Sequence, residues 1–194
     1  MFGYREARWP DAALPIIITA PIKMKNLLDQ SLRDSCAQWN KAAGIKIIDY
    51  EFDDYEFDDY GYSNSDLETY RDGKRRIYFV SDWSRISDDP TQLALTLYES
   101  VYFTIIEADV FFNLNFDFYY DGAIGRLRPG EEDFRTTLLH EMGHVLGLEH
   151  SNFQDSVMWF QANPMCPALN LSQSDIEAVK KRYSHPEKLF TPSY

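Results

Sequence analysis

Hydrophobic positions along the chain recur with two different periods, which predicts both strands and helices. Short apolar or alternating runs, typical of buried strands, occupy 14–19, 45–52, 75–80, 93–100 and 107–114, the last two joined by a short connection. A helical period covers 23–43, and Gly44 follows it where a helix stop belongs. The apolar face of this predicted helix comprises Met24, Leu27, Leu28, Leu32, Cys36 and Trp39.

Two more helices are predicted in the second half of the chain. Asp133 is a suitable N-cap for a helix through the run TTLLHEMGHVLG, which Gly147 would end. The run 171–183 is expected to form the closing helix, where Ser172 and Asp175 resemble a capping box. The buried stripe of that helix comprises Ile176, Val179 and Tyr183.

The order of these elements fits one α+β domain, in which helices pack against a mixed, twisted sheet. The length of 194 residues suits a single domain over 1–194, and no interdomain linker is visible. We expect its core over about 8–184 and a tail over 185–194. Residues 151–170 carry no periodicity and are expected to be irregular.

The charge of the chain narrows the range of partners. A formal net charge of −12 argues against nucleic acid and against anionic membranes, because both attract basic surfaces. No apolar run approaches the roughly 18 residues that a membrane span needs. The start of the sequence shows no signal-peptide pattern. Nothing in the pattern specifies an oligomer, so a monomer is expected.

The run LLHEMGHVLGLEHS at 138–151 gathers three histidines at spacings that suit a metal. His140 and His144 are four residues apart, which puts both imidazoles on one face of a helix. A left-handed turn at Gly147 would bring the chain back and deliver His150 as a third ligand. Three nitrogen ligands leave one zinc position open for water, which is the pattern of a catalytic site.

The spacing H-E-x-x-H-x-x-G-x-x-H, followed by a turn with a methionine, is the metzincin signature. Glu141 lies directly after the first histidine, so its side chain can project into a cleft that passes over this face of the helix. Met158, in the run SVMW, is the candidate for the Met-turn, an apolar floor beneath the metal. The alternative is three incidental histidines on a core helix, which would require all five fixed positions to match by chance.

These residues resemble the matrixins, the matrix-metalloproteinase branch of the metzincins. The specific features are HEMGHVLGLEHS, with Ser151 directly after the third histidine, and the SVM that follows. Weaker similarity spans most of 8–184, where RWPDAALPIIIT resembles the family's first strand and LSQSDIEAVKKRY its closing helix. The resemblance implies a metzincin-like zinc protease domain with a backing helix, an active-site helix and a C-terminal helix.

The sequence also departs from animal members of the family. Its only histidine outside the motif is His185, so the second, structural zinc site common in animal matrixins cannot be built. Cys36 and Cys166 do not resemble a latency cysteine, and their pairing stays open. Phe160 stands where some metzincins carry a tyrosine that reaches the metal. A minimal, microbial-type catalytic domain is therefore expected.

The resemblance implies a zinc-dependent endopeptidase with one catalytic ion. Glu141 would act as general base toward a metal-activated water. A peptide or protein substrate would align along the strand at 107–114 or the one before it. The alternative is a catalytically silent metzincin-like domain that serves as a binding module. By resemblance, the protein is expected to be secreted or exposed at the cell surface.

The resemblance also implies a pocket for the substrate side chain that follows the scissile bond. Its expected lining comprises Trp159, Phe160, Pro164 and Met165. Their apolar character predicts a hydrophobic preference at that substrate position.

An acidic, tyrosine-rich stretch carries the pentamer DYEFD twice in tandem within 49–60. Its many carboxylates suit a calcium ion, which prefers oxygen ligands. EF-hand spacing is absent, so an acidic strand extension followed by a solvated loop is the favoured interpretation.

Overall fold

A computed structural model of the chain describes residues 7–55, 73–120, 127–160 and 170–183. Its helices are α1 (Lys25–Ala43), α2 (Phe134–Val145) and α3 (Gln173–Tyr183), with short 3-10 turns at Asp11–Ala13, Ile22–Met24 and Trp83–Arg85. Its strands are β1 (Ile16–Pro21), β2 (Ile48–Asp53), β3 (Ile77–Val80), β4 (Ala94–Val101), β5 (Thr104–Asn113), β6 (Asp117–Tyr119) and β7 (Glu131–Asp133). The predicted α+β class is confirmed.

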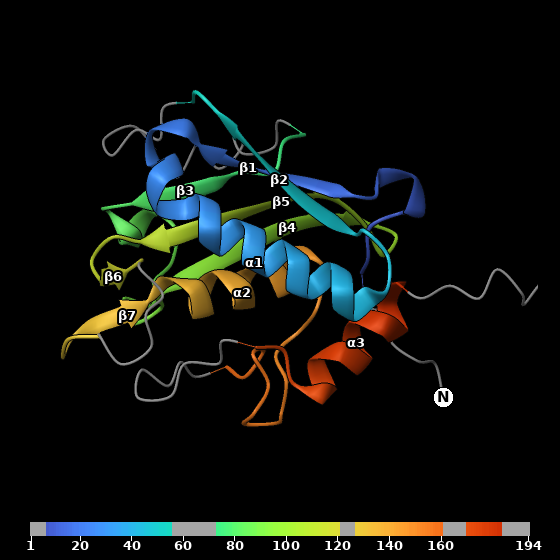
Figure 1. The fold of residues 1–194 in the computed structure, drawn as a ribbon. Helices are drawn as coiled ribbons and strands as arrows, with labels where there is room; N and C mark the ends of the chain where they lie inside the picture. The colour runs from blue at the N-terminus through green and yellow to red at the C-terminus, as the bar shows by residue number, and fades with distance from the viewer. Residues whose placement is uncertain (1–6, 56–72, 121–126, 161–169, 184–194) are drawn as a thin grey trace, which may run out of the picture.

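Five of the described strands lie side by side in one mixed layer (Figure 1). β1 pairs with β2 in parallel, β3 pairs with β5 in parallel, and β4 pairs with β5 in antiparallel orientation. A parallel bridge between Thr19 and Arg76 places β1 beside β3, which gives the order β2-β1-β3-β5-β4. Within the described part of the chain β4 pairs only with β5, so it forms one edge of the sheet.

The central strands bury side chains on both faces of the sheet. Ile77 and Phe79 of β3 belong to the main core together with Phe112 of β5, on the face that α1 and α2 cover. The opposite face holds a smaller cluster of Tyr78, Val80, Trp83 and Phe111. Because both faces are covered, every side chain of β5 from Glu107 to Asn113 is buried, including the polar ones of Glu107, Asp109 and Asn113.

The backing helix forms where the helical period predicted it, but its buried stripe differs at one position. Leu28, Leu32, Cys36 and Trp39 are buried as expected. Leu27 is 49% exposed, so its assignment to the apolar face was wrong. At 100° per residue, Leu27 lies outside the stripe centred on Leu28 and Trp39.

The hairpin of β4 and β5 is tighter than the sequence indicated. β5 begins at Thr104, three residues before the predicted strand, because the two strands are joined by a two-residue turn. Tyr102 and Phe103 form that turn with positive φ angles of 47° and 66°. Such turns usually carry glycine or asparagine, so the pattern gave no turn signal here. The short strands β6 and β7 were not predicted either.

Several sequence predictions fall partly or wholly outside the described residues. The first DYEFD pentamer forms most of β2, whereas residues 56–72 are not described. The same holds for Cys166 and for the tail at 185–194. Cys36 is a buried free thiol, and burial raises its pKa to about 12. None of the helices in the described part is long and apolar enough to cross a membrane.

Trp39 of α1 connects the backing helix to α2, and its loss should weaken the fold. The side chain is fully buried, and its indole Nε1 donates to the Leu139 carbonyl of α2 at 3.1 Å. We expect Trp39→Phe to lower the free energy of unfolding by about 1–3 kcal/mol, because packing volume and a buried hydrogen bond are both lost. Chemical denaturation would measure this change.

The matched control is Leu27→Ala on the exposed side of the same helix, which should stay within about 0.5 kcal/mol of the parental chain. Equal losses in the two variants would contradict the packing described for α1.

Candidate metal centre

The register of α2 is fixed at its first turn. Asp133 is the N-cap, as predicted: its side chain accepts from the Thr136 backbone N–H at 2.9 Å and from the Thr136 hydroxyl at 2.6 Å. Phe134, the first helical residue, is fully buried against the sheet. The cap and this anchor determine which face of α2 carries His140 and His144.

The end of α2 turns the chain back toward that face. Gly147 has a φ of +80°, in the left-handed region that glycine adopts at little cost. The Gly147 N–H donates to the His144 carbonyl at 2.8 Å, and the Leu148 N–H donates to the Gly143 carbonyl at 2.9 Å. These two bonds form a Schellman motif, which ends the helix and reverses the chain. His150 follows three residues later, as the sequence predicted.

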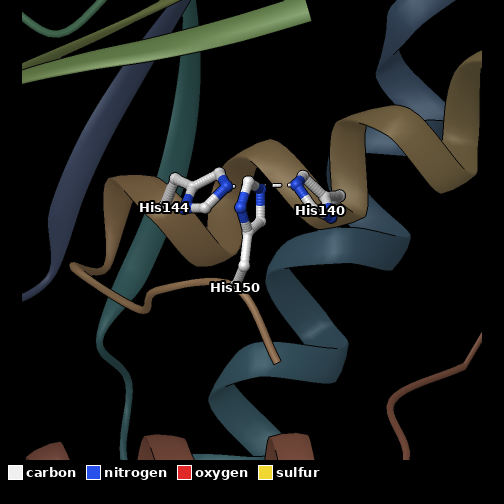
Figure 2. Close-up of side chains that lie close together, drawn as sticks. All are labelled: His140, His144 and His150. Carbon is white, nitrogen blue, oxygen red and sulfur yellow. Dashed lines mark hydrogen bonds between the residues drawn. The ribbon is translucent and has the colours of Figure 1, made fainter. Parts of the chain in front are cut away.

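The three histidines converge on one point (Figure 2). One ligand atom from each of His140, His144 and His150 lies within 4.8 Å of the other two. His140 and His144 are half-buried and His150 is exposed, so the cluster opens to solvent on one side. Among the described residues this is the group of side chains that can hold a metal ion.

Backbone carbonyls fix which nitrogen of each helical histidine faces the cluster. Nδ1 of His140 lies 2.7 Å from the Val157 carbonyl, and Nδ1 of His144 lies 2.7 Å from the Leu148 carbonyl. A carbonyl only accepts, so both Nδ1 atoms are donors, and in neutral imidazoles both Nε2 atoms carry lone pairs. The two Nε2 atoms are 3.0 Å apart. Two acceptors at this distance repel each other unless a cation lies between them, so the residues fit a metal.

Burial keeps these imidazoles in the form that binds metals. Desolvation lowers the pKa of His140 to about 4, and it also lowers the pKa of His144. Both side chains are therefore neutral near pH 7, when their lone pairs are available to a metal.

A buried carboxylate of α3 binds the backbone N–H of Val157, the residue whose carbonyl orients His140. Asp175 is 2% exposed, and it accepts from the Val157 N–H at 3.0 Å and from the Ser172 N–H at 2.8 Å. The Ser156 hydroxyl donates to its other oxygen. The predicted capping box exists, because the Asp175 N–H also donates to the Ser172 hydroxyl at 3.3 Å. Its link to the turn at Val157 was not predicted from the sequence.

Met158 lies beneath α2. Its side chain is 2% exposed, and a Cβ at Gly143 would collide with its sulfur and lie 3.0 Å from the Trp39 ring. Glycine at 143 therefore allows the turn to approach the helix closely. Trp159 and Phe160 follow, with ring centroids 4.6 Å apart and Phe160 56% exposed. The other predicted pocket residues, Pro164 and Met165, lie outside the described residues.

Glu141 is buried on α2, with 5% of its surface exposed. The Thr96 hydroxyl of β4 donates to its Oε2 at 2.5 Å. Burial raises the pKa of the Glu141 carboxyl, while nearby His144 and the Thr96 hydrogen bond act in the opposite direction. Sequence reasoning missed Thr96, because a lone threonine in a strand carries no signal of a partner 45 positions away.

Comparison with known proteins places this arrangement in a family. The Matrixin family model matches residues 29–184, which is most of the chain and includes all three histidines. The chain belongs to the matrixin family. The matrixin resemblance found in the motif is thereby confirmed, and the fold is that of a matrixin domain.

Individual relatives of this matrixin match over shorter stretches. Metalloendoproteinase 1 of Glycine max is 37% identical over 51 residues, covering 26% of this chain and 17% of the relative. Matrix metalloproteinase-2 of Drosophila melanogaster is 40% identical over 62 residues, covering 31% of this chain and 8% of the relative. The matched stretch thus spans less than a fifth of either relative.

Removing the charge of Asp175 should weaken the metal centre through Val157. The two carboxylate oxygens of Asp175 accept from Ser156, Val157 and Ser172, whereas the amide of Asp175→Asn offers only one acceptor oxygen. We therefore expect zinc affinity to fall by about 10- to 100-fold. Competition titration with a chromogenic chelator would measure it. Glu177→Gln removes a charge from the exposed side of the same helix and should keep parental affinity. Equal zinc affinity in all three proteins would exclude this supporting role.

Proposed function

We propose that this matrixin is a zinc-dependent endopeptidase that hydrolyses peptide bonds with Glu141 as general base. The observation that carries the proposal is the convergence of the His140 and His144 lone pairs beside His150. Membership of the matrixin family supports it, as do relatives named metalloendoproteinases. A silent binding module would not need a buried carboxylate beside the histidines.

The donor set suits zinc with one position left open. Imidazole nitrogens are typical zinc ligands, and three of them are the protein ligands of several catalytic zinc sites. Zinc bound here would supply Lewis acidity, which makes a water molecule more acidic and polarises a scissile carbonyl. The carbonyls of Val157 and Leu148 would hold two of the ligands in the required tautomer.

Glu141 supplies the proton transfers. Its carboxylate takes one proton from the attacking water as the new carbon–oxygen bond forms, and passes it to the amine nitrogen as the peptide bond breaks. A pKa raised by burial suits a base that must also act as an acid near neutral pH. The nucleophile is water, so no covalent enzyme intermediate is expected. Met158 would form the Met-turn, a rigid apolar floor beneath the histidines.

The substrate would be an extended peptide beside β4, which is the edge strand next to α2 among the described strands. Trp159 and Phe160 follow the turn beneath the histidines, where they would contribute to the pocket for the side chain after the scissile bond. Relatives of this matrixin include a metalloendoproteinase of Glycine max and a matrix metalloproteinase of Drosophila melanogaster, and we propose that this protein is a protease as well, secreted or exposed at the cell surface.

Replacing Glu141 separates proton transfer from metal binding. Glu141→Gln should retain zinc and lose at least about 100-fold in kcat, because the amide cannot accept the proton. Cleavage of denatured protein, followed by mass spectrometry with and without a chelator, would measure both effects. His144→Ala is the contrasting variant and should lose the zinc as well. Parental turnover by Glu141→Gln would refute the mechanism, and chelator-resistant cleavage would refute the zinc.

Specificity provides an independent test of the pocket. We expect a peptide library to yield cuts preferentially before large apolar side chains, because an apolar lining favours apolar groups by about 1–3 kcal/mol. Trp159→Ala should weaken that preference without changing the cut chemistry. A profile that favours charged residues at this position would contradict the apolar pocket.

A further inference from the structure

We propose that Thr96, on the edge strand β4, is a positioning residue for Glu141. Its hydroxyl holds one oxygen of the carboxylate, so that the other oxygen is kept for the attacking water. This inference rests on the proposed function of Glu141 as general base. It gives β4, in addition to α2, a part in the reaction.

The hydrogen bond itself indicates this role. Thr96 Oγ1 lies 2.5 Å from Glu141 Oε2 and 3.2 Å from the Glu141 backbone carbonyl. A hydroxyl has one proton, and the shorter contact has the length of a bond to an ionised carboxylate. The proton therefore goes to the side chain, and the carbonyl remains a secondary acceptor.

A buried glutamate needs such a restraint. The terminal torsion of a glutamate side chain has a broad, roughly two-fold energy profile, so the carboxylate rotates easily when nothing holds it. Within the part of the chain that the structure describes, Thr96 is the side chain that donates to this carboxylate. Threonine is also well suited to the task, because branching at Cβ restricts the torsion that aims its hydroxyl.

The hydrogen bond between Thr96 and Glu141 joins β4 to α2. Thr96 and Tyr98 point to the same face of β4, and both reach the α2 region: Tyr98 donates to the Glu149 side chain at 3.3 Å. In the proposed function the same strand aligns the substrate. Thr96 thus fixes the base relative to the strand that aligns the peptide, rather than relative to the helix alone.

Loss of the hydroxyl should reduce turnover selectively. Thr96→Val keeps the size and branching of the side chain but cannot donate. We expect kcat to fall by about 10- to 100-fold, because misplacing a catalytic group costs rates of this order. KM and the zinc dissociation constant should stay within twofold of the parental values. Thr96→Ser retains the donor and should recover most of the lost turnover.

Thr19→Val is the matched control. Thr19 on β1 donates to Glu51 of β2 at 3.2 Å, so this variant removes the same kind of hydrogen bond three strands away from β4. Its kcat should equal that of the parental protein. A loss in Thr19→Val as large as in Thr96→Val would overturn the proposal, because the effect would then reflect general destabilisation.

A second readout does not depend on turnover. In zinc-free protein, Thr96→Val should raise the unfolding equilibrium constant about fivefold or more when Glu141 is present, and by less than twofold in a Glu141→Ala background. Equal effects in the two backgrounds would show that the hydroxyl does not act on the carboxylate, and would overturn the proposal.

The outcomes separate this inference from the proposed function. Unchanged or increased kcat in Thr96→Val would overturn the positioning role, and so would loss of zinc from that variant. If the parental chain shows no chelator-sensitive cleavage, the proposed function fails. The unfolding measurements then still decide whether Thr96 holds the Glu141 carboxylate.

Discussion

The candidate metal centre depends on two hydrogen bonds from imidazole nitrogens to backbone carbonyls. Donation by Nδ1 of His140 and His144 to the carbonyls of Val157 and Leu148 leaves both Nε2 lone pairs facing one point. Neither acceptor belongs to α2 itself, since one lies in the turn before α3 and the other just past the helix end. The site is therefore defined less by the helix that carries His140 and His144 than by the segments that return to it.

Those returning segments are held by contacts that serve several purposes at once. Gly147 ends α2, reverses the chain and leaves room for the N-terminal segment, since a Cβ there would lie 2.5 Å from the Ala7 carbonyl. Gly143 lets Met158 pack directly beneath the helix. Asp175 both caps α3 and binds the turn at Val157. A substitution at any of these positions would disturb the fold and the ligand geometry together.

Local sequence patterns allowed much of the active-site helix and of the candidate metal centre to be predicted. The helix cap at Asp133, the reversal at Gly147 and the three histidines all depend on residues close together in the chain, which spacing reveals. The partnership of Thr96 with Glu141 joins positions far apart in the sequence, and the packing of α2 against β4 brings them together. The exposure of Leu27 follows from helical spacing, which places it outside the stripe of Leu28 and Trp39, whereas the early start of β5 depends on a turn without glycine.

The contact between Asp175 and Val157 also bears on the order in which the site is completed during synthesis. Domains fold as units while the chain emerges from its N-terminal end. All three histidines leave the ribosome before α3, yet Val157, whose carbonyl orients His140, gains its hydrogen bond to a carboxylate only when Asp175 follows. The nascent chain thus carries all three histidines before it has the contact that supports the orientation of His140, and translation of α3 supplies that contact.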